Sequence, residues 1–238
     1  MGTGLTHAAA AEQFGRWTIL RETGPAAELF KLERSMAFSA PTVRVLTVSA
    51  PTIVLGSSQS FEVVNQASTV DRGVDVVRRR SGGGAVWLDD DLLWVDVFVP
   101  AVDHLWDSDI GRSMWWLGDA WACALTAVGV SGAVVHKGPM VTSDWSALVC
   151  FAGLGPGEVT IGGKKVVGIS QRRTRAGALL QCGVVRQWAP SAFLSHLDLD
   201  LDRVPDRHRR TGVRPESAGV GVGAAADDAL SYLVTHLP

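Results

Sequence analysis

Residues 78–86 read Arg-Arg-Arg-Ser-Gly-Gly-Gly-Ala-Val, and this stretch is the most informative in the chain. Three arginines lead into a loop that has almost no side chains. Consecutive glycines allow backbone N–H groups to turn towards one anion, and arginine can hold a carboxylate or phosphate through two parallel hydrogen bonds. The stretch predicts an anion-binding loop between strands at 74–79 and 85–88. A tight turn beside a solvated charge run would give the same pattern.

Residues 159–173 form the second informative stretch, Val-Thr-Ile-Gly-Gly-Lys-Lys-Val-Val-Gly-Ile-Ser-Gln-Arg-Arg. Two apolar runs separated by Gly162 and Gly163 predict a hairpin with a two-residue turn. Side chains alternate along a strand, so Lys165 would share a buried face with Val167 and Ile169. A buried lysine is costly unless an anion meets it. Lys165 is therefore a candidate site residue, and its neighbour Lys164 is expected at the surface.

The remaining hydrophobic pattern predicts a strand-rich chain with a few helices. Further strands are expected at 17–20, 42–48, 52–55, 92–99 and 178–185, and helices at 25–38, 61–71, 109–128, 191–197 and 225–237. The helices do not alternate regularly with the strands, and no internal repeat is present. This arrangement predicts the α+β class, with a mixed β-sheet core and flanking helices.

Composition excludes several classes of protein. The 238 residues include 24 acidic and 22 basic side chains, which is not the basic surplus that a general nucleic-acid binder needs. A hydrophobic fraction of 47% excludes wholesale disorder, and no apolar run is long enough to cross a membrane. Three widely spaced cysteines form neither a disulfide framework nor a metal-binding pattern, so we expect no metal site and a cytoplasmic location.

The chain is expected to have three parts. Residues 1–13 are Ala-rich, lack the pattern of a signal peptide and are predicted to be disordered. Residues 14–200 contain both informative stretches and most predicted strands, and would form one catalytic domain. Residues 201–238 are polar and basic, then rich in Gly and Ala, and are expected to form a C-terminal extension made of a linker and a helix.

Together the two stretches resemble the lipoate–protein ligase and octanoyltransferase family, which is the sister family of the biotin–protein ligases. Residues 78–86 match its RRxSGGGxV motif, and residues 165–168 match its K-x-x-G motif. The resemblance implies the biotin/lipoate–protein ligase catalytic-domain fold, a mixed sheet that encloses an apolar acyl tunnel. It implies a catalytic Lys165 that reaches the acyl carbonyl oxygen. It also implies that the acyl group or a nucleotide is bound by Arg79, Ser81, Gly82, Gly83, Gly84, Ala85 and Gly168.

Cys150 is the second catalytic candidate. It precedes Phe151 and lies 15 residues before Lys165. A Cys-Phe pair at this distance resembles the cysteine-dependent octanoyl- and lipoyl-transferases of the same family, in which a thiolate takes the acyl chain as a thioester. The ordinary fate of a free cysteine is to pack as a small buried hydrophobe. Cys182, in a Gln-Cys-Gly segment where relatives often have Gln-His-Gly, is a weaker candidate.

One departure from the family concerns the ligases. They follow the glycines with a His-Asp-x-Gly-Asn run, whereas residues 87–91 here read Trp-Leu-Asp-Asp-Asp. The His is replaced by Leu88 and the Gly-Asn pair is absent, which speaks against activation of the acyl group by ATP. The three consecutive carboxylates are expected to form a solvated turn, because they cannot converge on one metal ion.

The resemblance implies an enzyme of protein lipoylation that transfers an octanoyl or lipoyl group to one lysine of a lipoyl domain. A thioester on Cys150 is the preferred route, with acyl carrier protein or an acylated protein as donor. No tightly bound cofactor is expected, and lipoate or octanoate is the substrate group. Three alternatives stay open: an ATP-dependent lipoate–protein ligase that uses ATP and Mg²⁺ to form lipoyl-adenylate, a non-catalytic relative that binds an acyl group or a lipoyl domain, and biotin ligation on the same fold. No nucleic acid or membrane is expected as a partner.

Overall fold

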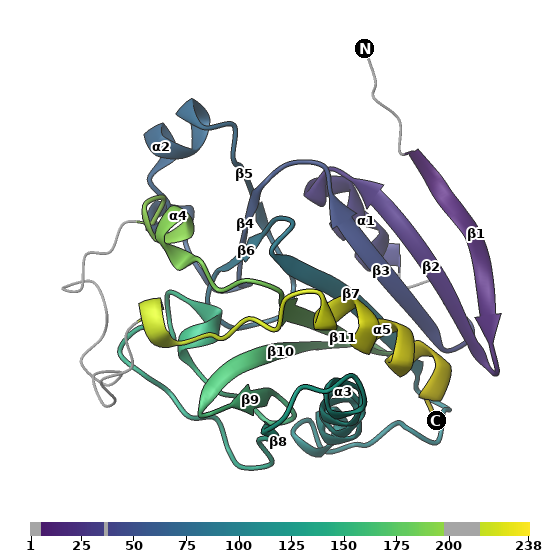
Figure 1. Ribbon diagram of the computed structural model, residues 1–238. Helices are drawn as coiled ribbons and strands as arrows, with labels where there is room; N and C mark the ends of the chain where they lie inside the picture. Colours follow the sequence, from purple (N-terminus) through teal and green to yellow (C-terminus); the bar gives the residue numbers. More distant parts are fainter. Residues whose placement is uncertain (1–5, 36–37, 198–214) are drawn as a thin grey trace.

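The computed structural model describes residues 6–35, 38–197 and 215–238 (Figure 1). The main sheet has eight strands in the order β1-β2-β3-β7-β11-β10-β9-β8, and a second sheet has three in the order β5-β4-β6. The strands are β1 (Thr6–Phe14), β2 (Trp17–Gly24), β3 (Thr42–Val48), β4 (Thr52–Leu55), β5 (Asp75–Arg78), β6 (Val86–Leu88), β7 (Leu92–Pro100), β8 (Ala133–Val135), β9 (Val159–Ile161), β10 (Lys164–Arg173) and β11 (Gly177–Val185). The helices are α1 (Ala26–Ser35), α2 (Gln66–Asp71), α3 (Trp115–Ala127), α4 (Pro190–Leu194) and α5 (Ala225–His236), with short 3₁₀ turns η1 (Phe61–Val63), η2 (Arg112–Met114), η3 (Cys150–Ala152) and η6 (Pro215–Ser217).

Strands β7 and β11 lie at the centre of the main sheet because both are apolar along nearly their whole length. Each buries all but one of its nine residues, and the two pair antiparallel from Leu92↔Val185 to Pro100↔Gly177. Strand β3 pairs antiparallel with β7 and parallel with β2. The sheet is therefore mixed, and the predicted α+β class is confirmed.

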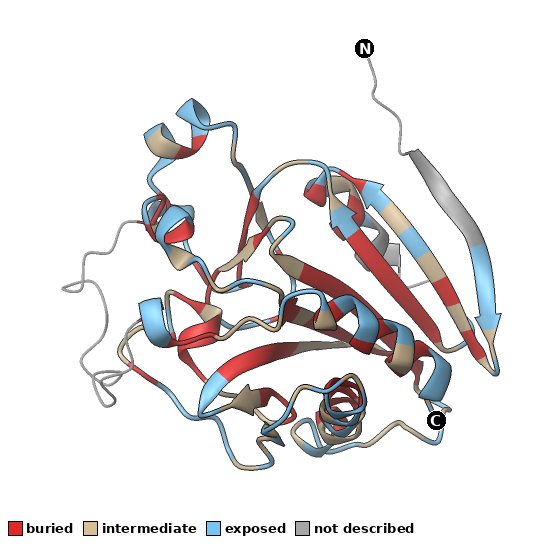
Figure 2. Cartoon of the chain, in the orientation of Figure 1, coloured by how far each residue is buried: buried red, intermediate tan, exposed pale blue. Residues whose placement is uncertain are grey.

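Different elements cover the two faces of the main sheet. Helices α3 and α5 pack on one face, where Val95 and Val97 of β7 join the largest hydrophobic cluster (Figures 1 and 2). Helix α1 and the small sheet pack on the other face, against Leu46 and Trp94. Neighbouring residues such as Trp94 and Val95 point to opposite faces because side chains alternate along a strand. The candidate site lies on the Trp94 face.

The small sheet positions the glycine loop. Strand β4 pairs parallel with β5 and antiparallel with β6, so the connection from β5 to β6 lies at the end of the sheet where β4 finishes. Gly56, the residue after β4, contacts this loop closely. A Cβ built at Gly56 would lie 1.8 Å from the carbonyl oxygen of Gly83, so only glycine fits there.

The hairpin predicted from residues 159–170 is confirmed. Gly162 and Gly163 have φ values of 57° and 77°, which a two-residue hairpin turn requires at both positions. Lys165 is buried and Lys164 is exposed, as predicted. A register shift in the pairing with β9 interrupts the strict alternation between Lys165 and Val167, so residues 165–169 are all buried.

Some elements differ from the prediction. Residues 6–13, expected to be disordered, belong to β1, because they can pair along the edge of the sheet with β2. The helix expected at 61–71 is divided into η1 and α2, since Asn65 is extended and its side chain caps α2 by accepting from the Ser68 amide. The helix expected at 109–128 starts as the 3₁₀ turn η2 and becomes α-helical at Trp115.

The predicted C-terminal helix is present as α5 and packs against α3. Its Leu230 and Leu233 are buried in the main core. Residues 198–214, which include most of the predicted linker, lie outside the described residues. No helix within the described part of the chain is long and apolar enough to cross a membrane.

Candidate active site

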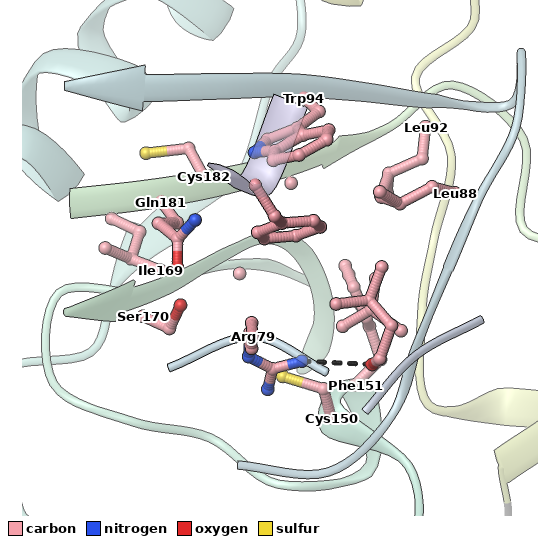
Figure 3. Close-up of a pocket in the computed structure, with 15 residues that line it drawn as sticks. Arg79, Leu88, Leu92, Trp94, Cys150, Phe151, Ile169, Ser170, Gln181 and Cys182 are labelled. Atoms are coloured by element: carbon pink, nitrogen blue, oxygen red, sulfur yellow. Dashed lines mark hydrogen bonds between the residues drawn. The ribbon is translucent and has the colours of Figure 1, made fainter. Parts of the chain in front are cut away.

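An apolar cavity of about 60 Å³ lies between the small sheet and the Trp94 face of the main sheet (Figure 3). A water molecule needs about 10–15 Å³ of such space, so the cavity holds about four to six water-sized groups. This space would hold about four to six carbons of an acyl chain, which is part of an octanoyl group. Its apolar wall consists mainly of Phe30, Val54, Val86, Leu88, Leu92, Trp94, Phe151 and Ile169, and its polar lining is Arg79, Cys150, Ser170 and Gln181.

Arg79 clamps the glycine loop from within. It is buried, and its Nη2 donates to the carbonyl oxygens of Gly82 and Gly84, each at 2.8 Å. Its Nη1 donates to the Val54 carbonyl at 3.2 Å. These bonds occupy much of the guanidinium with the protein's own backbone. Arg79 lies at the predicted position beside the cavity, and its contacts are those of a group that shapes the loop.

The glycine loop leaves its own N–H groups available. Among the residues that the structure describes, none accepts a hydrogen bond from the amides of Gly82, Gly83 or Gly84. The Ala85 amide is already engaged, because it donates to the Leu148 carbonyl at 2.7 Å. The three glycines therefore remain candidates for holding an anion or an oxyanion.

Cys150 lines the cavity next to this loop (Figure 3). Its amide donates to the Ala85 carbonyl at 3.0 Å, which fastens η3 to the start of β6. A Cβ built at Gly84 would lie 2.7 Å from the Cys150 nitrogen, and one built at Gly83 would lie 3.8 Å from the Cys150 Sγ. The half-buried thiol is thus held directly against the glycine loop, at the polar end of an otherwise apolar cavity.

Gly83 and Gly82 give a matched pair for testing the loop. Gly83 has a φ of 99°, where an L side chain is strained by about 1–2 kcal/mol, and its Cβ would lie 3.0 Å from Arg79 Nη2. Gly82 has nothing within 4 Å of a built Cβ and no positive φ. We expect Gly83→Ala to reduce transfer strongly and Gly83→Val to abolish it, with Gly82→Ala close to wild type. Equal activity of all three in an acyl-transfer assay would show that the loop is only a turn.

Lys165 is buried behind Cys150 and does not line the cavity. Its Nζ donates to the Cys150 carbonyl at 2.9 Å and forms an ion pair with Glu158 Oε2 at 2.7 Å. Both side chains are at most 5% exposed. The negative charge that balances buried Lys165 is therefore the Glu158 carboxylate of the protein itself. Lys165 fixes the backbone of the candidate nucleophile, which differs from the direct contact with the acyl carbonyl that the resemblance implies.

Glu158 is a residue that the sequence did not reveal. Its carboxylate also accepts from the amides of Gly155 at 2.5 Å and Ile169 at 3.1 Å, so the turn before β9, strand β10 and Lys165 are joined through one side chain. The one available signal was an acidic residue directly before an apolar strand, which is too common to single out a site.

A row of polar side chains forms part of the cavity wall. Ser81, in the glycine loop, donates to Gln181 Oε1 at 2.9 Å and lies 3.0 Å from the Ser170 hydroxyl. Gln181 donates to Asp96, which also accepts from Trp94 and pairs with Arg44. Ser81 does not itself line the cavity, and these hydrogen bonds join it to Ser170 and Gln181, which do. Gly168 brings β10 close to Phe151, since its built Cβ would lie 3.6 Å from that ring.

Cys182 also lines the cavity, but its chemistry differs from that of Cys150. Burial raises the pKa of the Cys182 thiol to about 12, so this thiol stays protonated at neutral pH. The thiolate is the nucleophilic form of cysteine. Cys182 is therefore unsuited to nucleophilic attack, and it packs as part of the main core.

Alkylation of the native protein should distinguish the three thiols. At neutral pH we expect iodoacetamide to modify exposed Cys123 and half-buried Cys150, and to modify Cys182 only after unfolding. Raising the pH towards the high pKa of Cys182 should speed its modification. Peptide mapping by mass spectrometry gives the site of each adduct, and early labelling of Cys182 would contradict the assignment.

Two other ionisable side chains near the site make structural contacts. Asp89 accepts from Trp87 Nε1 and from the Asp91 amide, which shapes the turn between β6 and β7. His196 stacks on Trp87, and burial lowers its pKa. No group of three His, Cys, Asp or Glu side chains within the described residues is arranged to hold a metal ion.

Comparisons with known proteins agree on one family. Residues 26–212 match the model of the lipoyl protein ligase A/B catalytic domain. Octanoyltransferase LipM of Moorella thermoacetica is 32% identical over 66% of this chain and 58% of its own length, and the same enzyme of Kyrpidia tusciae is 30% identical over 72% and 64%. The chain thus spans less than two thirds of these relatives.

Solved structures show the same fold. The bi-partite lipoate protein ligase from Thermoplasma acidophilum, described with its E2 lipoyl domain, has a TM-score of 0.64 at 18% identity, covering 94% of this chain and 82% of that one. A lipoate-protein ligase A bound with ATP has a TM-score of 0.63 at 17% identity, covering 93% and 83%. The predicted catalytic-domain fold is confirmed.

Proposed function

The chain belongs to the lipoyl protein ligase A/B catalytic-domain family, and from this premise we propose that it transfers an octanoyl or lipoyl group to one lysine of a lipoyl domain through a thioester on Cys150. One observation carries the proposal. A thiol lines an apolar cavity and lies against a loop whose three glycine amides have no acceptor among the described residues. The octanoyltransferase relatives, at about 30% identity, support the same reading.

The first half-reaction loads the enzyme. The Cys150 sulfur attacks the thioester carbon of an acylated carrier protein, a carbon–sulfur bond forms, and the bond to the carrier's sulfur breaks. The carrier leaves as a thiol that carries the proton given up by Cys150. The acyl chain would occupy the apolar cavity, where its methylenes leave water at a gain of about 0.8 kcal/mol each.

The second half-reaction transfers the acyl group from Cys150 to the acceptor lysine. The neutral amine of the acceptor lysine attacks the same carbon, an amide bond forms, and the bond to Cys150 breaks. The proton of the amine passes to the departing sulfur, which regenerates the thiol. Both steps place negative charge on the acyl oxygen, and preorganised N–H donors such as those of Gly82 to Gly84 stabilise such charge. Lys165, paired with Glu158, would act as a positioning residue that holds Cys150.

The principal rival is ATP-dependent ligation. The RRxSGGGxV loop is shared with ligases, and one neighbour of the same fold is described with ATP. Against it, Leu88 replaces the ligase His and lines the apolar cavity. The run from Asp89 to Asp91 also adds carboxylates where a nucleotide phosphate would be repelled.

Donor dependence tests the proposal. The purified chain is incubated with an apo lipoyl domain and either octanoyl-acyl carrier protein without ATP, or octanoate with ATP and Mg²⁺. We expect octanoylation of the lipoyl domain, measured as a mass increase, with the first donor only. Modification that requires octanoate and ATP would overturn the transferase and support the ligase. If the lipoyl domain stays unmodified with both donors, the chain would be a protein that binds an acyl group or a lipoyl domain without catalysis.

A further inference from the structure

A second cavity, of about 40 Å³, adjoins the acyl cavity and shares Val86, Leu92 and Phe151 with it. A water-sized group requires about 10–15 Å³, so the second cavity holds about three or four such groups in sequence. Its wall is mostly apolar and includes four aromatic side chains, Trp87, Trp188, Phe193 and the shared Phe151. These dimensions and this lining suit a short, unbranched aliphatic arm.

The inner end of the second cavity lies at the nucleophile. Ala85 and Val149 line it and are at most 1% exposed. Val149 precedes Cys150 in the chain, and Ala85 accepts the hydrogen bond of the Cys150 amide. An arm that fills the cavity would therefore end beside the backbone that carries the thiol.

The outer end of the second cavity is acidic. Among the residues that the structure describes, Asp89 and Asp91 are the only charged side chains that line it, and both are half-buried. Asp89 is engaged by Trp87 Nε1, whereas the Asp91 carboxylate has no hydrogen-bond donor among the described residues. Burial, and then repulsion by Asp89 and Asp90, raises the pKa of Asp91, and the charge of Arg186 offsets part of this shift. A cation at this mouth would relieve that repulsion, and a phosphate would increase it.

We infer that the second cavity receives the side chain of the acceptor lysine, an inference that rests on the proposed function for the identity of the reaction. Asp91 and Asp89 would attract the ammonium at the mouth, and the aromatic side chains of the wall would contact its methylenes. Apolar surroundings disfavour the charged form of an amine, so the lysine would lose its proton to water on entering. The neutral amine would then attack the thioester carbon on Cys150, with the proton passing to the departing sulfur.

Asp91→Asn tests this inference, with Asp90→Asn as its matched control. Asp90 is adjacent, is exposed and does not line the second cavity. Each protein is first octanoylated on Cys150 with octanoyl-acyl carrier protein and then mixed with increasing amounts of apo lipoyl domain. We expect equal loading of all three. For Asp91→Asn alone, the lipoyl-domain concentration at half-maximal rate should rise about tenfold, as for the loss of one charged contact.

Two further measurements distinguish a defect in binding the acceptor lysine from a defect in the reactivity of the thioester. Hydroxylamine, a small neutral nucleophile, should release the acyl group as octanohydroxamate, and regenerate the Cys150 thiol, at the same rate from all three acyl-enzymes. The inference would be overturned if wild type and Asp91→Asn reached half-maximal rate at the same lipoyl-domain concentration. It would also be overturned if Asp90→Asn raised that concentration as much as Asp91→Asn does. If the wild type forms no acyl-enzyme, the proposed thioester fails. In that case the lipoyl-domain concentration at half-maximal rate is compared in the overall acylation reaction with octanoate and ATP. A rise of about tenfold in Asp91→Asn alone would still support the acceptor cavity.

Discussion

Cys150→Ser should lower acyl transfer from octanoyl-acyl carrier protein by about a thousandfold or more, as expected when a nucleophile is removed. One atom changes in a half-buried side chain, so the fold should persist. The serine hydroxyl is almost un-ionised at neutral pH, and no histidine of the described residues lines the cavity to act as its base. Turnover is measured as octanoylation of a lipoyl domain, and circular dichroism reports whether the variant is folded.

Cys123→Ser is the matched control for this variant. Cys123 is exposed on α3 and does not line the cavity. It should retain wild-type turnover. Near-normal transfer by Cys150→Ser would contradict the thioester mechanism, because the acceptor lysine would then attack the donor directly.

Lys165→Ala should strongly lower both activity and stability. The substitution leaves the Glu158 carboxylate buried without its cation, and breaking such a pair costs about 3–5 kcal/mol. It also removes the bond from Lys165 to the Cys150 carbonyl, so the thiol loses its fixed place beside Gly83. Transfer should fall below detection, and denaturant unfolding should show the lower stability. Exposed Lys164→Ala is the control and should resemble wild type.

A double variant separates stability from positioning. Lys165→Met with Glu158→Gln removes both charges while keeping the volume, and such replacements of buried ion pairs are often neutral or stabilising. We expect the double variant to recover most of the lost stability and little of the activity. Recovery of both would show that Lys165 serves only the fold.

Local patterns predicted much of this fold. Gly162 and Gly163 defined the hairpin because a two-residue turn requires positive φ, and glycine adopts it freely. The apolar runs that became β7 and β11 predicted buried strands. Strand β1 was missed because an Ala-rich edge segment has no strand pattern, and its pairing with β2 is set by the sheet.

The candidate site was predictable as a set of residues but not as a set of contacts. Arg79, Cys150 and Gly168 do converge on one cavity, and Gly83 lies beside Arg79 and Cys150. The partner of Lys165 was not foreseen, because Glu158 reaches it across the hairpin from a turn whose geometry the sequence does not specify. Likewise, the Arg79 guanidinium was expected to meet a ligand, and its bonds to Gly82 and Gly84 depend on how the loop folds back.

The central claim is that Cys150 carries the acyl group, and intact mass spectrometry tests it most directly. The protein is incubated with octanoyl-acyl carrier protein in the absence of any lipoyl domain, and the adduct is located by peptide mapping. The account predicts one octanoyl group per chain, on Cys150, that disappears when a lipoyl domain is added. An unmodified chain, or an adduct confined to Cys123, would contradict it.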